Sequence, residues 1–84
     1  MAIFAVIAPQ DDGRLALAVQ NKFPRHYKFG PGQYMVNAVG PTSHAIAQEL
    51  GASGEVGLFV VFSIAGYWGY YDKSLWEWLT INSG

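Results

Sequence analysis

The sequence contains no cysteine, so the chain can form no disulfide, no zinc–thiolate site and no thiol nucleophile. Charged residues are also scarce: they make up 13% of the 84 residues, and the net charge is −1. A weakly acidic chain lacks the electrostatic footprint of a nucleic-acid-binding protein. Hydrophobic residues make up 51% of the chain, which excludes intrinsic disorder. This length predicts a single domain, 1–84, with a core at 2–65 and an aromatic C-terminal tail at 66–84.

The apolar run 56–71 has no charged residue, but it is too short to cross a membrane as a helix, which takes about 20 apolar residues. Its centre, 58–64, is rich in β-branched and aromatic residues, which favours a buried strand. The apolar N-terminus has no basic leader and is interrupted by Pro9, so we expect no signal peptide. We therefore expect a cytoplasmic protein that does not contact a membrane.

Apolar spacing predicts the first strand and the first helix. Residues 2–8 form a short apolar run, which is typical of a buried strand. Apolar residues recur every fourth position within 14–23, so this segment is expected to be helical. Asp11 or Asp12 can cap the helix, because a carboxylate accepts hydrogen bonds from free amides of the first turn.

Glycine and proline at 30–33 indicate a tight turn between two short strands, 26–29 and 34–39. These strands would form a hairpin. The alternative joins 26–39 into one bent strand, which would give three βα units.

The second half of the chain repeats a helix and a strand. Thr42 or Ser43 can cap a helix that runs to residue 50, and 56–65 is the expected last strand. A capping-box spacing then starts a short helix at Leu75. The resulting order, β-α-β-β-α-β plus a C-terminal helix, predicts an α+β protein: a ferredoxin-like two-layer sandwich in a single domain.

Both faces of this predicted sheet are apolar. In the first strand, Ile3, Ala5 and Ile7 point one way, and Phe4 and Val6 point the other. The last strand is equally apolar on both sides. Two helices cover only one face, and leaving large apolar side chains in water would cost roughly 1.5–3 kcal/mol each.

We therefore expect a second layer over the other face, supplied by a second copy of the chain or by the aromatic tail. A twofold homodimer is the commonest way to bury a self-complementary patch, and it is the favoured interpretation. The candidate interface residues are large, apolar or aromatic, and lie in the first strand, the last strand or the tail: Phe4, Val6, Phe59, Val61, Tyr67, Trp68, Trp76 and Trp78.

Aromatic residues concentrate in the tail, where all three tryptophans and three of the five tyrosines lie within 67–78. Such a cluster can stack a ligand or a nucleic-acid base, or it can form core between subunits. Lys73 is the one basic residue among these rings, which favours core over nucleic-acid binding.

Basic residues concentrate between positions 14 and 28, interleaved with aromatic residues. This mixture can grip phosphate groups. The favoured interpretation is a solvated helix face next to an edge strand protected by charge, because so few charges give only a small electrostatic footprint. The candidate ligand or phosphate contacts are Arg14, Lys22, Arg25, His26 and Lys28.

No motif places a nucleophile, a histidine and an acid together, so we expect a non-catalytic protein without a cofactor. Asp11 and Asp12 are weak candidates for metal ligands, because paired aspartates before a helix are more often caps. No metal site is predicted.

In element order, residues 2–65 resemble small bacterial ferredoxin-like proteins of the CRISPR-associated small endoribonuclease family. The resemblance implies a homodimer in which an aspartate ending the first strand holds a metal ion between two copies. Here that stretch reads Val6-Ile-Ala-Pro9 and lacks the aspartate, while Asp11 and Asp12 follow the proline.

Three functions follow from these observations. The leading hypothesis is a non-catalytic homodimeric interaction or structural module. One alternative is a metal-dependent nuclease-like protein of the family named above. The other is a small-molecule-binding dimeric α+β barrel, lined by the two histidines, Tyr34 and the tail aromatics.

Overall fold

The computed structural model describes residues 2–39 and 42–82, which form three helices and four strands. The chain is an α+β protein, as predicted. In chain order, the elements are β1 (Ala2–Ile7), α1 (Gly13–Lys22), β2 (His26–Gly30), β3 (Gln33–Ala38), α2 (Ser43–Leu50), β4 (Val60–Ile64) and α3 (Lys73–Asn82).

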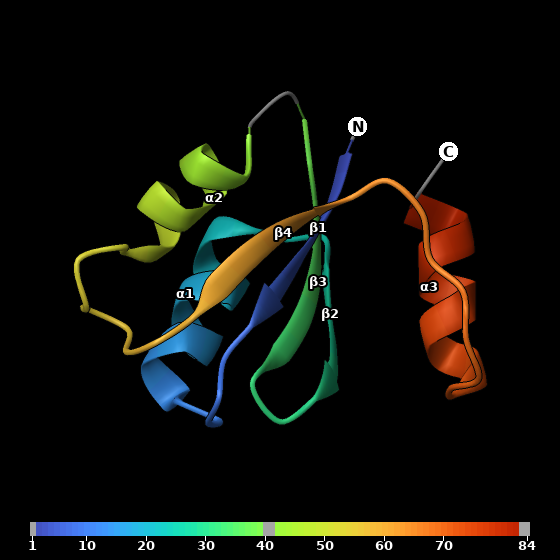
Figure 1. Ribbon diagram of the computed structural model, residues 1–84, viewed down its shortest axis with the longest axis horizontal. Coiled ribbons are helices and arrows are strands. Elements are labelled where there is room, and N and C mark those ends of the chain that lie inside the picture. The colour runs from blue at the N-terminus through green and yellow to red at the C-terminus, as the bar shows by residue number, and fades with distance from the viewer. Residues whose placement is uncertain (1, 40–41, 83–84) are drawn as a thin grey trace.

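The four strands form one antiparallel sheet in the order β2-β3-β1-β4 (Figure 1). β1 lies between β3 and β4, so Ala5 faces Met35 on one side and Phe62 on the other. The predicted hairpin of β2 and β3 is confirmed, and the alternative of one bent strand over 26–39 is wrong. Consequently β2 and β4 are the two edges of the sheet.

Helices α1 and α2 cover one face of the sheet. The Asp12 carboxylate caps α1 by accepting a hydrogen bond from the Arg14 amide at 2.9 Å, and the Thr42 hydroxyl caps α2 by accepting from the Ala45 amide at 3.2 Å. Beneath these helices lies the larger apolar core, whose buried members include Phe4, Val6, Leu15, Val19, Val36, Ile46 and Leu50.

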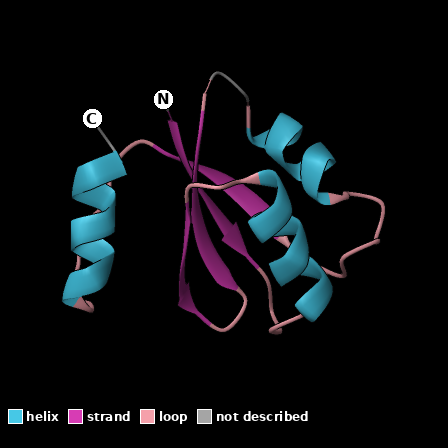
Figure 2. Cartoon of the chain, turned by 180° about the vertical axis from the view of Figure 1, so that it is seen from behind, coloured by secondary structure: helices cyan, strands magenta, loops and turns pink. Residues whose placement is uncertain are grey.

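The third helix, α3, packs on the opposite face of the sheet, so that the sheet lies between α3 and the other two helices (Figure 2). Leu75 and Leu79 are buried there. Their partners are the buried side chains that point away from α1 and α2: Ile3, Ala5 and Met35. The tail therefore folds back and covers its own sheet, which was one of the two coverings expected from sequence.

The expected orientation of the strands was wrong. Phe4 and Val6 are completely buried under α1 and α2, and it is Ile3 and Ala5 that face α3. Alternation along a strand predicts which residues share a face. Where both faces are apolar, it does not predict which face the helices cover.

The last strand is shorter than expected: β4 begins at Val60, not at residue 56. A turn occupies 52–56, and Gly57 then has a φ of +83°, which an extended strand does not allow. Val56 is nevertheless buried in the core below α1 and α2. The third helix begins at Lys73, two residues before the expected start at Leu75.

Candidate functional site

The outer side of β4 is the most exposed apolar feature of the sheet. β4 is an edge strand, with β1 as its only neighbour among the described strands. Phe62 is 53% exposed, Val60 is 46% exposed, and Leu58, just before the strand, is 79% exposed. The whole stretch 56–71 carries no charge, so this edge lacks the charged side chains that usually protect edge strands.

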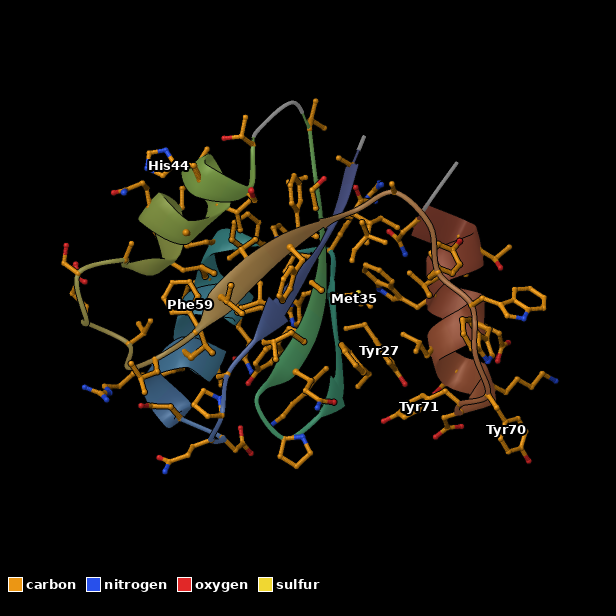
Figure 3. All side chains as sticks on the ribbon, viewed as in Figure 1. Tyr27, Met35, His44, Phe59, Tyr70 and Tyr71 are labelled. Atoms are coloured by element: carbon orange, nitrogen blue, oxygen red, sulfur yellow. The ribbon has the colours of Figure 1, made fainter. Side chains whose placement is uncertain are left out.

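The position of α3 explains this exposure. Val60 is paired with Ile7, and Phe62 with Ala5, so both side chains lie on the face that α3 occupies. The helix packs on the part of this face formed by β1, β3 and β2, where Tyr27 and Met35 point toward it (Figure 3). On β4, Ile64 packs against this layer, whereas Val60 and Phe62 on the same face remain exposed.

The opposite edge of the sheet, β2, is protected by the tail. The Tyr71 hydroxyl donates a hydrogen bond to the Phe29 carbonyl, and the two rings meet edge to face with centroids 6.1 Å apart. Lys28 adds a charge on the same strand. The two edges therefore differ: β2 is charged and covered, whereas β4 is apolar and open.

Polar contacts fix α3 to the sheet at both of its ends. At the start of the helix, the hydroxyls of Tyr27 and Ser74 share a hydrogen bond of 2.5 Å. At its end, the Asn37 side-chain amide donates to the Asn82 carbonyl at 2.9 Å. Together with the ring contact of Tyr27 and Trp78, whose centroids are 6.2 Å apart, these bonds define one docked position for α3.

The linker between β4 and α3 exposes its aromatic residues. Trp68 is 98% exposed and Tyr70 is fully exposed. Tyr67 lies against Trp76 of α3 with nearly parallel rings, at an angle of 26° and a centroid distance of 6.3 Å. The Tyr67 and Trp76 rings border a cleft of about 330 Å³ together with Trp68, Gly69 and Thr80.

A second hollow, of about 450 Å³, lies along β4 on the side of the sheet that α1 and α2 cover. One wall is α2, which presents the small side chains of Ser43 and Ala47 and the imidazole of His44. Phe59 and Val61 form part of the other wall; His44 and Phe59 are labelled in Figure 3. A strand added beside β4 would extend the sheet along this hollow.

The candidate interface residues fall into three groups. Phe4 and Val6 belong to the interior of this chain, so their assignment to an exposed surface is corrected. Phe59 and Val61 are half-buried and pack against the core under α1 and α2. The tail residues Tyr67, Trp68, Trp76 and Trp78 range from the exposed linker to the half-buried faces of α3.

Two of the five candidate phosphate contacts are engaged by acids of this chain. The Arg14 guanidinium lies 2.7 Å from the Asp12 carboxylate, and the hydrogen bonds from the Arg14 side chain and amide lower the pKa of Asp12. The Lys28 ammonium lies 3.0 Å from Asp11, and this hydrogen bond raises the pKa of Lys28. These ion pairs partly neutralise the charge that a phosphate would need.

The three remaining candidates surround the turn between α1 and β2. Lys22 is exposed in the last turn of α1, and Arg25 is exposed just before β2. His26 is half-buried, with its Nδ1 atom 2.6 Å from the Phe23 carbonyl oxygen. His26 is thus engaged with the backbone at the end of α1.

Asp11 and Asp12, the candidate metal ligands, are each engaged by a basic side chain. Asp12 is also the cap of α1. Within residues 2–39 and 42–82, no three histidine or acidic side chains come close enough to hold a metal ion.

Sequence reasoning missed the side chains that stand out in the structure: Leu58, Val60 and Phe62. A signal for them was present, because they alternate along an uncharged segment. Their exposure, however, depends on the edge position of β4 and on how far α3 extends over the sheet, and the alternation predicts neither.

A scan against protein-family models, a search of curated proteins and a search of solved structures each find no match to this chain. In the described part of the chain, none of the helices has the length and apolarity needed to cross a bilayer.

Proposed function

We propose that the chain is a non-catalytic interaction module that forms a homodimer through β4. The observation that carries this proposal is the open, uncharged edge of β4 with Val60 and Phe62 exposed. An unprotected apolar edge strand is a template for pairing with another strand. The covered and charged edge at β2 leaves β4 as the edge at which a second chain can add.

The sequence of β4 suits pairing with itself. In an antiparallel twofold arrangement centred on Phe62, the Phe62 side chains of the two copies would lie opposite one another, and Val60 would face Ile64 of the second copy. Strand alternation keeps these side chains on the α3 face in both copies. The paired segment brings no charged residue against another, so no repulsion opposes this register.

Such pairing would cover the exposed side chains of Val60 and Phe62, which α3 does not bury. Val60 and Phe62 of both copies would form one continuous patch between the two α3 helices. Cross-strand pairs of aromatic and β-branched side chains stabilise a sheet by roughly 0.2–1 kcal/mol each, in addition to the area they bury. The hydrophobic contact and the new backbone hydrogen bonds therefore act in the same direction.

The strand order β2-β3-β1-β4, with α1 and α2 on one face, supports the ferredoxin-like layout for each protomer. The two alternative functions have less support. Asp11 and Asp12 are engaged in ion pairs, which disfavours a metal-dependent nuclease. A barrel built from two sheets face to face would have to displace α3 from Ile3, Ala5 and Met35.

The test is the molar mass in solution over a wide concentration range, measured by sedimentation or light scattering. The protomer has a mass of 9.2 kDa, and we expect the measured mass to rise toward twice this value. Phe62→Lys should hold the protein as a monomer, because a lysine on the edge opposes strand pairing. A wild-type protein that stays monomeric throughout overturns the proposal.

Leu17→Lys is the matched control. Leu17 is 60% exposed on α1 and is therefore an equally apolar surface position away from β4. This variant should dimerise like the wild type. If Leu17→Lys and Phe62→Lys weaken the dimer equally, β4 is not the interface. Charge substitution of Phe4 is unsuitable for this purpose, because Phe4 is buried and its replacement would unfold the monomer.

A further inference from the structure

The linker between β4 and α3 and one side of α3 line a cleft. Leu75, Trp78, Leu79 and Asn82 lie at helical spacing and face the sheet. Trp76 and Thr80 are one turn apart on α3 and line the cleft of about 330 Å³, and Trp76 also packs against the edge of the α3 core. A volume of this size is at the lower end of small-molecule sites, which span about 300–1,000 Å³.

Aromatic rings dominate the lining of this cleft. Tyr67 and Trp76 present nearly parallel rings, inclined by 26°. Trp68 lies on the linker beside them and is 98% exposed, so its indole is available to a ligand. Aromatic rings recognise another ring by stacking on its apolar face.

The polar chemistry of the cleft narrows the class of ligand. None of its five lining residues is charged. The Thr80 hydroxyl donates its hydrogen to the Trp76 carbonyl at 2.9 Å, which leaves the hydroxyl oxygen able to accept a hydrogen bond. The cleft is therefore suited to a neutral ring that carries hydroxyl or amine donors at its edge.

We propose that this cleft binds a neutral ring that has an apolar face and hydrogen-bond donors at its edge, with the apolar face on Trp68 and the edge directed to Thr80. A sugar ring and a free nucleobase share this chemistry. A phosphate-linked polymer does not, because none of the residues that line the cleft is basic, and Lys73 beside it is accompanied by Asp72 and Glu77. The site uses neither β4 nor its partner strand, so it stands whether or not the chain forms a dimer.

The test follows the three tryptophan indole N–H resonances while the full chain is titrated with N-acetylglucosamine, cellobiose and adenosine. Trp78 packs against Tyr27 and serves as an internal reference. We expect at least one probe to shift the Trp68 and Trp76 signals with saturation and to leave Trp78 unchanged. A response to the sugars identifies a sugar ring as the ligand, and a response to adenosine identifies a nucleobase. Absence of a saturable shift with all three probes at millimolar concentration overturns the proposal.

Two variants then test the assigned contacts. Trp68→Ala should weaken binding about 10-fold or more, as expected for loss of one stacked ring. Thr80→Val should weaken it about fivefold by removing the acceptor. Tyr70→Ala is the control, since Tyr70 is an exposed aromatic of the same linker that does not line the cleft. Equal weakening by Tyr70→Ala and Trp68→Ala would show that the linker binds nonspecifically, against the proposal.

Discussion

The Asn37 side-chain amide donates a hydrogen bond to the Asn82 carbonyl, which lies 45 positions later in the chain, at 2.9 Å. Asn37 is the one buried polar residue of the sheet among those described, and it faces α3. Because a buried amide without a partner is costly, this bond favours the docked position of the helix over slipped alternatives. The tail is thus a specific layer of the fold.

The packing of α3 on the sheet predicts that truncation of Leu79 strongly lowers the stability of the fold. This side chain is 1% exposed and packs in the cluster with Ile3, Ala5 and Met35. Leu79→Ala should lower the free energy of unfolding by about 2–5 kcal/mol, since it removes buried methyl groups and leaves a cavity. Denaturant titration measures this change.

Ile81→Ala is the control for this prediction, because Ile81 is in the same helix but is 80% exposed. Its effect should stay within about 0.5 kcal/mol. Similar values for the two variants would mean that α3 does not pack on the sheet through Leu79.

The turn between β2 and β3 predicts that replacement of Gly32 lowers the stability of the fold. Gly32 has a φ of +69°, and a Cβ atom there would come within 2.7 Å of the Gln10 carbonyl oxygen and 2.9 Å of the Ala8 carbonyl oxygen. Backbone atoms cannot move aside as a flexible side chain can. Gly32→Ala should therefore destabilise by roughly 2 kcal/mol and lower the Tm by about 10 °C.

Gly13→Ala provides the comparison in a thermal melt. Gly13 begins α1 and has open space where a Cβ would lie. Alanine at this position should leave the Tm unchanged or raise it slightly, because it reduces the freedom of the unfolded chain. A Gly32→Ala variant as stable as Gly13→Ala would contradict the close approach of the turn to residues 8–10.

The ion pair at the start of α1 predicts a pH-dependent contribution to stability. Hydrogen bonds from Arg14 lower the pKa of Asp12 in the folded chain. The contribution is therefore fully present above the ordinary aspartate pKa of about 3.9 and is lost as the pH falls through the lower folded value. Asp12→Asn keeps a capping side chain but removes the charge.

The measurement is the difference in Tm between the wild type and Asp12→Asn as a function of pH. The wild type should be the more stable protein at pH 7, and the difference should close in strong acid. Because the pair is at the surface, about 1 M salt should also reduce the difference. A difference that stays constant from neutral pH into strong acid would exclude the charge of Asp12 as its source.

Local signals were sufficient for much of this fold. Asp12 and Thr42 cap α1 and α2 as expected, and the glycine and proline at 30–33 lead to the hairpin of β2 and β3. These features depend on residues close in sequence, so a short pattern specifies them. The tail helix was expected from a capping box at Ser74, but α3 begins at Lys73, so Ser74 lies inside the helix and its hydroxyl bonds to Tyr27.

Features that depend on distant residues were not predictable in the same way. Phe4 and Ile3 are both large and apolar, and only the placement of α1, α2 and α3 decides which core each one joins. The exposure of Phe62 likewise arises because the layer formed with α3 includes Ile64 of the edge strand but does not bury Phe62. Sequence periodicity predicts that a face is apolar, but long-range packing decides what covers it.

The last helix also affects how the chain can fold during synthesis. Ile3 and Ala5 are made well before their cover, Leu75 and Leu79, because α3 follows β1 in the chain. Strand β1 likewise cannot pair until β3 and then β4 have been made, since both of its neighbours follow it in the chain. A nascent chain on the ribosome therefore carries a bare apolar surface until α3 has emerged, and chaperones that bind such surfaces have that interval in which to act.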